Sequence, residues 1–255
     1  MHFLLNHPLL VFLITIVVLW ASAHVGAALR RRRMTMEEAE RGDYGVILAA
    51  ILTLLALIIG FSFSMASTRY DQRKNLEEEE ANAIGTEYVR ADLLPAATAE
   101  RVRALLRSYL DQRILYYTSH GGDSLSQINA ATVNLQAQLW DAVKAPAGAE
   151  RSAVEALTVS GMNDVLNSQG YTQAAWWNRI PKAAWGLMWV IAICCNVMIG
   201  YYMRPADRKG IRFFVMPVII AVSFLLIADI DSPGTGIIRV QPQNLTSLAS
   251  SLQPK

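Results

Sequence analysis

Four apolar segments, each close to the length of a membrane-spanning helix, dominate this chain of 255 residues. They cover residues 7–29, 45–67, 183–203 and 213–230. About 20 apolar residues in a helix cross the roughly 30 Å hydrocarbon layer of a bilayer. Only helices and closed barrels satisfy their backbone groups in lipid, and these segments lack the alternation of barrel strands. The sequence therefore predicts an all-α membrane protein with four transmembrane helices in two pairs.

Both short links between paired segments are rich in arginine and lysine, which favours the cytoplasmic side of the membrane. The N-terminus, the central stretch and the C-terminal tail are then expected outside. No basic residue precedes the first apolar segment and four arginines follow it, which favours a retained anchor over a cleaved signal peptide. The basic residues are Arg30, Arg31, Arg32, Arg33 and Arg41 in the first link, and Arg204, Arg208, Lys209 and Arg212 in the second.

The chain divides into four predicted parts: a first transmembrane pair (1–67), a soluble helical domain (68–181), a second transmembrane pair (182–231) and a tail (232–255). From residue 45 to about 91 there is no proline, and after residue 67 apolar residues keep helical spacing. We therefore expect the second transmembrane helix to extend into the soluble domain and to end near Leu94-Pro95.

The rest of the central stretch also has the pattern of helices. Thr98 is a plausible N-cap for one helix and Ser124 for the next, and a further helix is expected over residues 150–166. The first two helices each have a predicted apolar face, formed by Val102, Leu105, Leu106, Tyr109 and Leu110 in one and by Ile128, Ala131, Leu135, Leu139 and Val143 in the other. Strand-like alternation is absent from this stretch. A helical bundle is the simplest architecture that fits.

Sequence motifs of enzymes are absent: there is no phosphate-binding glycine loop, HExxH, CxxC or GxSxG. Cys194 and Cys195 are adjacent in an apolar segment, and neighbouring residues on a helix do not bridge easily. The four histidines are scattered. We expect neither enzyme activity nor a cofactor, metal site or nucleic-acid partner.

Small residues recur every four positions in the second transmembrane segment, at Gly60, Ser64 and Thr68. This spacing permits close helix packing, and the same face is suited to lining a pore because small hydroxyl residues leave room for water and ions. Large apolar residues on this segment suit either a constriction or contact with lipid. The pore-lining candidates are Ile59, Gly60, Phe63, Ser64, Ser67 and Thr68.

An acidic run, Glu77 to Glu80, follows about ten residues beyond this segment. One interpretation is a solvated helix face, or partners for Arg69, Arg73 and Lys74. The other is an acidic ring at a pore mouth, if several copies surround an axis. The vestibule candidates are Asp71, Glu77 and Glu80.

Two acidic residues, Asp229 and Asp231, mark the point where the fourth apolar segment ends. Ionisable residues at this depth are costly unless they are paired or hydrated. A structural clamp that anchors the tail, with Arg239 as a partner, is the favoured interpretation. Contact with an ion pathway is the alternative.

Two stretches resemble the bestrophin-like family of bacterial membrane proteins. Residues 77–117 carry Glu-Ala-Asn-Ala-Ile, then Leu-Pro, then an arginine-rich helix with a tyrosine, and residues 228–242 carry Asp-x-Pro-x-x-Gly followed by an Arg-Val-x-Pro turn. The motif residues are Asn82, Pro95, Arg103, Arg107 and Tyr109 in the first stretch, and Asp229, Asp231, Pro233, Gly236 and Arg239 in the second.

This resemblance implies kinship with bestrophins, which are pentameric ion channels whose second transmembrane helix lines the pore and continues into the soluble part. It also implies a multi-pass protein of the bacterial inner membrane. The sequence departs from bestrophins in three respects. The charge pattern predicts the soluble domain in the periplasm, whereas bestrophins hold theirs in the cytoplasm. The clustered acidic residues of the calcium clasp and the repeated aromatic neck are not found here.

Two classes of function follow. The first is a homo-oligomeric ion channel, with a pentamer favoured and inorganic ions as its permeating partners. The second is a non-conducting membrane scaffold or sensor whose exported helical domain binds a partner. A transporter built from a degenerate inverted repeat is a third possibility. The channel is preferred because the long second helix matches the bestrophin arrangement.

Overall fold

A computed structural model describes residues 7–31, 38–119, 123–147, 153–203 and 211–253. All regular structure in these ranges is helical, which confirms the predicted all-α class. The helices are α2 (Pro8–Arg31), α3 (Glu38–Arg90), the 3₁₀ turn η1 (Ala91–Leu93), α4 (Ala96–Thr118), α5 (Asp123–Ala147), α6 (Ala153–Trp177), α7 (Lys182–Tyr202), α8 (Arg212–Asp231) and α9 (Gln243–Ser251).

The chain forms two compact units. Unit 1 comprises Met1–Thr68 and Arg179–Ile238, and unit 2 comprises Arg69–Asn178 and Arg239–Lys255. Helix α3 begins in unit 1 and ends in unit 2. The last residues of the chain, from Arg239 onward, group with unit 2.

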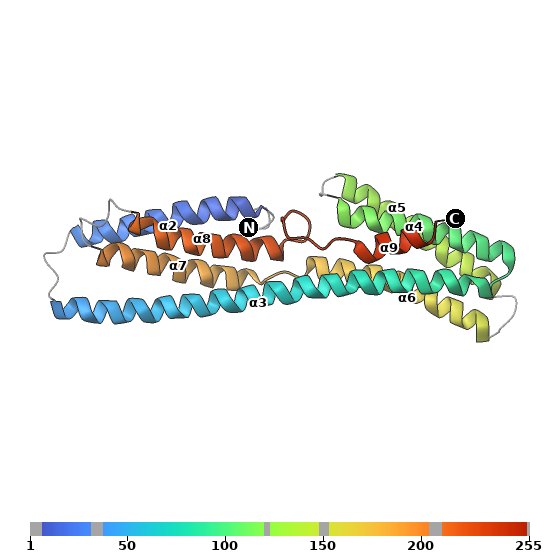
Figure 1. Cartoon of the computed structure of the whole chain (residues 1–255), viewed down its shortest axis with the longest axis horizontal. Coiled ribbons are helices and arrows are strands. Elements are labelled where there is room, and N and C mark those ends of the chain that lie inside the picture. Colours follow the sequence, from blue (N-terminus) through green and yellow to red (C-terminus); the bar gives the residue numbers. More distant parts are fainter. Residues whose placement is uncertain (1–6, 32–37, 120–122, 148–152, 204–210, 254–255) are drawn as a thin grey trace. The chain divides into compact units, whose positions relative to one another are not determined.

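Unit 1 is held together by close packing of α2 against α7 and α8, which run side by side in Figure 1. At two positions the backbones approach so closely that only glycine fits. A Cβ at Gly26 would overlap the Val197 carbonyl group of α7, and a Cβ at Gly200 would overlap the Ala23 carbonyl group of α2. Close approach through small residues is the usual way in which helices pack in lipid.

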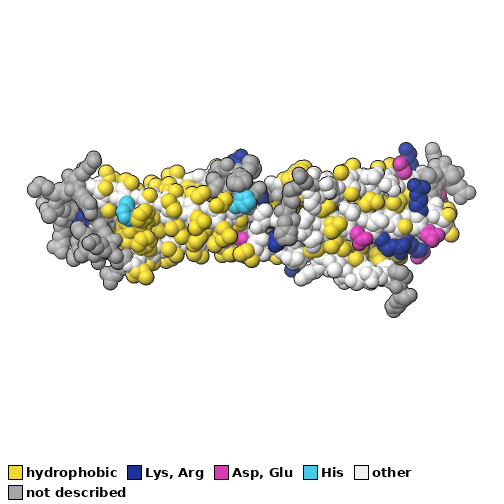
Figure 2. Space-filling model, turned by 90° about the horizontal axis from the view of Figure 1, so that it is seen from above, with side chains coloured by type: hydrophobic (Ala, Val, Ile, Leu, Met, Phe, Trp, Pro, Cys, Tyr) yellow, Lys and Arg dark blue, Asp and Glu magenta, His cyan; other side chains and the backbone are white. Residues whose placement is uncertain are grey.

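Four helical stretches contain a window long and apolar enough to cross a membrane: Pro8–Arg30, Gly42–Leu93, Glu155–Tyr202 and Phe213–Asp231. In the two longest stretches the apolar windows belong to unit 1, and the polar remainder belongs to unit 2. Figure 2 shows hydrophobic side chains over one face of unit 1 and charged side chains gathered on unit 2. The chain is a membrane protein with four apolar helical spans.

Helix α3 has 53 residues, which corresponds to about 80 Å at 1.5 Å per residue. Its extension beyond the apolar segment confirms the prediction of one long helix. After Arg90 the chain tightens into η1, and Leu94 adopts extended backbone angles (φ −91°, ψ 159°). A residue before proline is driven out of the helical region by the proline ring, so Pro95 ends the helical path here.

Unit 2 is a bundle of α4, α5, α6, α9 and the last part of α3. Its core contains aliphatic side chains from each of these helices, including Ile84, Leu106, Leu139, Met162 and Leu245. The predicted apolar faces of α4 and α5 point into this core.

Several helix starts differ from those predicted. Helix α4 begins at Ala96 with Pro95 as its N-cap, so Thr98 lies in the first turn. The fixed φ of proline already suits a helix start, which explains the earlier beginning. Helix α5 begins at Asp123 rather than after Ser124. Helix α6 is longer than the predicted residues 150–166 and continues to Trp177.

Most basic residues that predict the membrane orientation lie outside the described side chains; these are Arg31, Arg32, Arg33, Arg41, Arg204, Arg208, Lys209 and Arg212. Arg30 is described. Its Nη1 donates to the carbonyl oxygens of Tyr202 and Met203, each at 2.7 Å. These are terminal carbonyls of α7, where positive charge is favourable. Arg30 therefore caps α7 and ties it to α2.

Candidate functional site

The candidate pore residues lie on the part of α3 that belongs to unit 1. Along this part the buried side chains are Leu55, Ser62 and Ala66, which recur at intervals of seven and four and form one stripe. Ser64 follows Ser62 by two positions, a rotation of about 200°, so it lies on the opposite side of the helix. The small residues therefore face away from the stripe by which α3 contacts its own chain.

Exposure within the chain agrees with this helical arrangement. Gly60, Ser64 and Thr68 are exposed, and Ile59 and Ser67 are half-buried. Phe63 is 40% exposed and flanks the small residues on one side. The Thr68 hydroxyl donates to the Ser64 carbonyl oxygen at 3.0 Å, which satisfies its polar group within the helix.

The vestibule candidates separate into two groups. Asp71 is exposed, whereas the Glu77 and Glu80 side chains are buried in unit 2. Glu77 accepts hydrogen bonds from the Leu245 backbone N–H at 2.9 Å and from the Asn244 side chain at 2.7 Å. Leu245 lies in the first turn of α9, where backbone N–H groups lack helical partners and a carboxylate is favourable. Glu77 thus caps α9.

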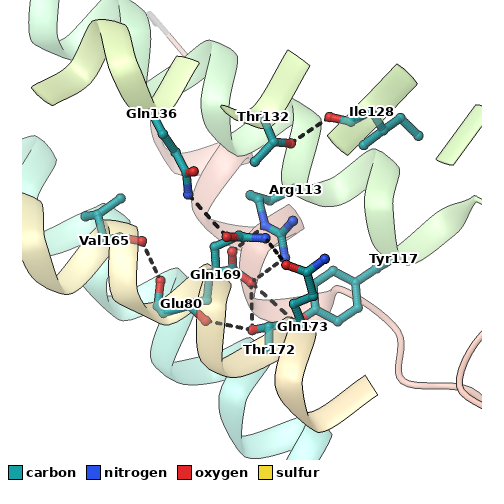
Figure 3. A network of polar contacts seen from close by, with 11 residues as sticks. Glu80, Arg113, Tyr117, Ile128, Thr132, Gln136, Val165, Gln169, Thr172 and Gln173 are labelled. Atoms are coloured by element: carbon teal, nitrogen blue, oxygen red, sulfur yellow. Dashed lines mark hydrogen bonds and ion pairs between the residues drawn. The ribbon is translucent and has the colours of Figure 1, made fainter. Parts of the chain in front are cut away.

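Glu80 lies at the centre of a polar network that joins α3, α4 and α6 (Figure 3). Its carboxylate is paired with the Arg113 guanidinium and accepts from the Tyr117 and Thr172 hydroxyls at 3.4 and 3.3 Å. The Glu80 and Arg113 side chains are both completely buried. The roles of Glu77 and Glu80 at a pore mouth stay predictions, while within the chain both carboxylates are used to hold helices together.

The electrostatics of this network follow from burial and pairing. Burial alone would lower the pKa of the Arg113 guanidinium, but the Glu80 carboxylate outweighs it and raises that pKa. Arg113 also lies 4.5 Å from the centre of the Tyr116 ring, a cation–π distance. The Arg113 guanidinium is therefore held in its charged form inside the core.

The first group of motif residues lies along the last part of α3, the turn at Pro95 and α4, all in unit 2. Pro95 begins α4, and Asn82 is exposed on α3. Arg107 donates to the Tyr88 hydroxyl at 3.0 Å. Tyr109 is fully buried in the core. These residues shape the turn and the helix contact.

The second group closes a turn at the end of α8. Asp229 accepts from the backbone N–H groups of Ile237 and Ile238, both at 2.8 Å, and Asp231 accepts from the Ile180 N–H at 3.1 Å. A Cβ at Gly236 would lie 2.6 Å from the Asp229 carbonyl oxygen, so a side chain does not fit there.

Backbone N–H groups therefore donate hydrogen bonds to both aspartates of this clamp, and the Arg179 guanidinium also interacts with the Asp231 charge. Pro233 is half-buried within the turn. Arg239, the predicted partner of the aspartates, is the first residue of the second segment of unit 2.

The partners of the buried carboxylates were not predicted from the sequence. Arg113 and Thr172 lie far from Glu80 along the chain. One signal was available: Arg113 continues the apolar face of α4 through Leu106, Tyr109 and Leu110, and an arginine on such a face requires a buried acid. Among the described residues, no group of three or more His, Cys, Asp or Glu side chains could hold a metal ion.

Comparisons with known proteins agree with this architecture. No curated protein matches the chain at a significant level. A crystal structure of a bacterial bestrophin homolog from Klebsiella pneumoniae with one substitution is similar in fold: TM-score 0.62, 13% identity, covering 96% of this chain and 97% of that one. Another crystal structure, of a membrane protein variant, gives TM-score 0.64 and 12% identity, covering 96% of each chain.

Similarity at this level of identity shows the fold alone. The family is shown by sequence, because the pattern of the Bestrophin-like domain matches residues 12–245, most of the chain. The chain belongs to the bestrophin-like family.

Proposed function

We propose that this protein is an oligomeric ion channel in which several copies surround an axis and the unit 1 part of α3 lines the pore. One observation carries the proposal: the apolar segment of α3 is only 11% buried within the chain, whereas those of α7 and α8 are 44% and 50% buried. A helix with so little cover from its own chain meets either lipid or other copies of the chain, and its small polar residues suit a hydrated axis between copies better than lipid.

The proposed lining is the face opposite Leu55, Ser62 and Ala66. It contains Gly60, Ser64 and Thr68, which are exposed, with the half-buried Ser67 at its edge. Phe63 flanks this face and is the proposed apolar constriction, whereas Ile59, seven residues before Ala66, lies beside the buried stripe. In each copy of the protein, the buried stripe packs α3 against its own chain, and the small residues face the axis.

The proposed vestibule is formed by exposed acids of α3. Asp71 lies seven residues after Ser64, so it continues the same face, and Glu78 lies a further seven residues on. Both are exposed, unlike Glu77 and Glu80. A ring of these carboxylates would favour cations over anions. A pentamer in the bacterial inner membrane with unit 2 in the periplasm completes the proposal.

The experiment is recording of currents from purified protein in planar bilayers, with a matched pair of tryptophan variants. Ser64→Trp places a bulky ring on the proposed lining and is expected to reduce conductance at least about tenfold, since a pore of this kind has little spare width. Val190→Trp, on an exposed position of α7, is expected to leave conductance unchanged. Silent bilayers from intact wild-type protein, or equal effects of the two variants, would refute the proposal.

Selectivity tests the vestibule separately. Asp71→Asn is expected to lower the ratio of cation to anion permeability, and Asp141→Asn, an exposed acid of α5, is the control. Unchanged selectivity in Asp71→Asn with an intact conductance would remove the vestibule assignment and leave the pore lining in place.

A second candidate function is a non-conducting scaffold or sensor. It is favoured by large apolar side chains exposed on unit 2, namely Val133, Leu157 and Tyr171. Such residues often mark a protein-binding surface when they form a patch. Co-purification of one stoichiometric partner together with silent bilayers would favour this candidate over the channel.

A further inference from the structure

Glu87 is a buried carboxyl group that receives no hydrogen bond from the part of the chain that the structure describes. It lies in unit 2, well beyond the apolar segment of α3, and its side chain is 0% exposed. Neither carboxyl oxygen has a hydrogen-bond partner among the described residues. A charged carboxylate buried in this way is strongly disfavoured relative to the neutral acid.

The surroundings of Glu87 define an interface between two helices. Its carboxyl group faces Gly161 of α6 so closely that a Cβ at Gly161 would overlap both this group and the Arg90 guanidinium. Glycine at this position lets α6 approach α3 directly over the carboxyl group. Because the Glu87 side chain is fully buried, a charge on it would have little access to bulk water.

Two other buried carboxylates of the same helix have hydrogen-bond partners of the kind that Glu87 lacks among the described residues. Glu77 is held by Asn244 and the Leu245 N–H, and Glu80 is held by Arg113 and two hydroxyls. Each of these two carboxylates has donors placed against its oxygens. Glu87 is equally buried but lacks such bonds, so its protonation state is linked to how tightly the interface is closed.

The charged groups that act on Glu87 come from α3 itself and from α6, against which η1 also packs. Arg90 is on α3 itself and Asp164 is on α6. Asp92 of η1 is paired with Arg103, and α6 has one further acid, Glu155. Burial raises the pKa of the Glu87 carboxyl to about 8; Arg90 opposes this and Asp164 adds to it.

We propose that protonation of Glu87 controls the interface between α3 and α6. The neutral carboxyl group keeps this interface closed, and the charged carboxylate loosens it. The proposal concerns unit 2 and does not depend on whether the protein conducts ions. It assigns to Glu87 a regulatory role that links the packing of α6 to external pH.

The direction of the pH effect follows from linkage. In an opened interface the carboxyl is hydrated and titrates near its ordinary pKa of 4.5, whereas in the closed interface it titrates near 8. Between these values the closed state binds more protons than the open state. Raising the pH through this window therefore favours opening by about tenfold per pH unit, and the effect levels off above the upper value.

Hydrogen exchange of the full-length protein in nanodiscs, followed by mass spectrometry, tests this directly. Exchange of α6 peptides around Gly161 is compared between wild type and Glu87→Gln at each pH from 5 to 9, so that the intrinsic pH dependence of exchange cancels. The wild-type to variant ratio is expected to rise at least about tenfold between pH 5 and pH 7 and to level off above pH 8. Glu78→Gln, an exposed neighbour on α3, is the control and should give no rise.

A second readout does not need the variant. Within wild type, α6 peptides are compared with α5 peptides, which share the intrinsic pH dependence but not the carboxyl group. A flat ratio in both comparisons, or an equal rise in Glu78→Gln, would overturn the proposal.

Discussion

The two units of this protein hold their helices together by different means. In unit 1 the backbones of α2 and α7 meet at Gly26 and Gly200. In unit 2 three carboxylates of α3 point into the core, and two of them are matched by hydrogen bonds and an ion pair. Lipid gives little hydrophobic drive between helices, so close contact matters most there; a bundle in water buries apolar surface and can include paired charges.

Helix α3 takes part in both kinds of packing. Its first part presents a narrow buried stripe and a largely uncovered surface, and its last part buries a side chain at almost every turn. The contrast indicates that the first part meets surroundings other than its own chain. It is also why the pore is proposed there.

Breaking the ion pair of unit 2 should have the largest effect on stability. Arg113→Met leaves the Glu80 carboxylate buried without its main partner, and we expect the free energy of unfolding to fall by about 3–5 kcal/mol. Denaturant unfolding in a mild detergent, followed by circular dichroism, measures this change.

The double variant Glu80→Leu/Arg113→Met removes both charges and should recover most of the loss. Arg107→Met, an exposed arginine of the same helix, is the control and should cost less than about 1 kcal/mol. An equal loss of stability in Arg107→Met and Arg113→Met would show that the buried ion pair contributes no more to stability than an exposed arginine.

Disturbing the glycine contact of unit 1 should have a smaller effect. Gly200→Ala inserts a methyl group against the Ala23 carbonyl group and should destabilise the protein by about 1–3 kcal/mol. Gly186→Ala on the same helix has open space around it and should be neutral or slightly stabilising. The test is to measure the thermal unfolding midpoints of both variants in the same detergent. Equal midpoints would contradict close packing at Gly200.

Releasing α9 should have the smallest effect of the three. Glu77→Ala removes the acceptor for Leu245 and Asn244, at a cost of about 1–2 kcal/mol, as for the loss of a helix cap. We expect limited proteolysis to cut the C-terminal segment faster, while the rest of unit 2 stays resistant.

Glu78→Ala, its exposed neighbour, is the matched control for this experiment. If the two variants are cut at the same rate, Glu77 does not anchor α9.

The periodic features of the sequence predicted much of this fold. Long apolar segments and helical spacing were sufficient for the four spans, for the length of α3 and for the core faces of α4 and α5. Helix starts were less predictable: Thr98 has the chemistry of an N-cap, but the fixed backbone of Pro95 starts α4 earlier. At such positions, N-capping and the backbone restriction of proline predict different helix starts, and the sequence alone does not show which of them applies.

The candidate site was predictable only in part. Small residues on one face of α3 were visible as a four-residue repeat, but the side on which the chain packs depends on Leu55, Ser62 and Ala66 meeting other helices. The acidic run had two interpretations because the partners of Glu77 and Glu80 come from α9, α4 and α6. Contacts between residues far apart in the chain leave no local signal, and this is also why the burial of Glu87 was not anticipated.

Single-particle electron microscopy of the protein in nanodiscs would test the proposed pore most directly. We expect a ring of copies around a hydrated axis, with Gly60, Ser64 and Thr68 of each α3 facing that axis and Phe63 beside them. A monomer, or an oligomer in which this face of α3 meets lipid while the axis is closed by other helices, would contradict the channel.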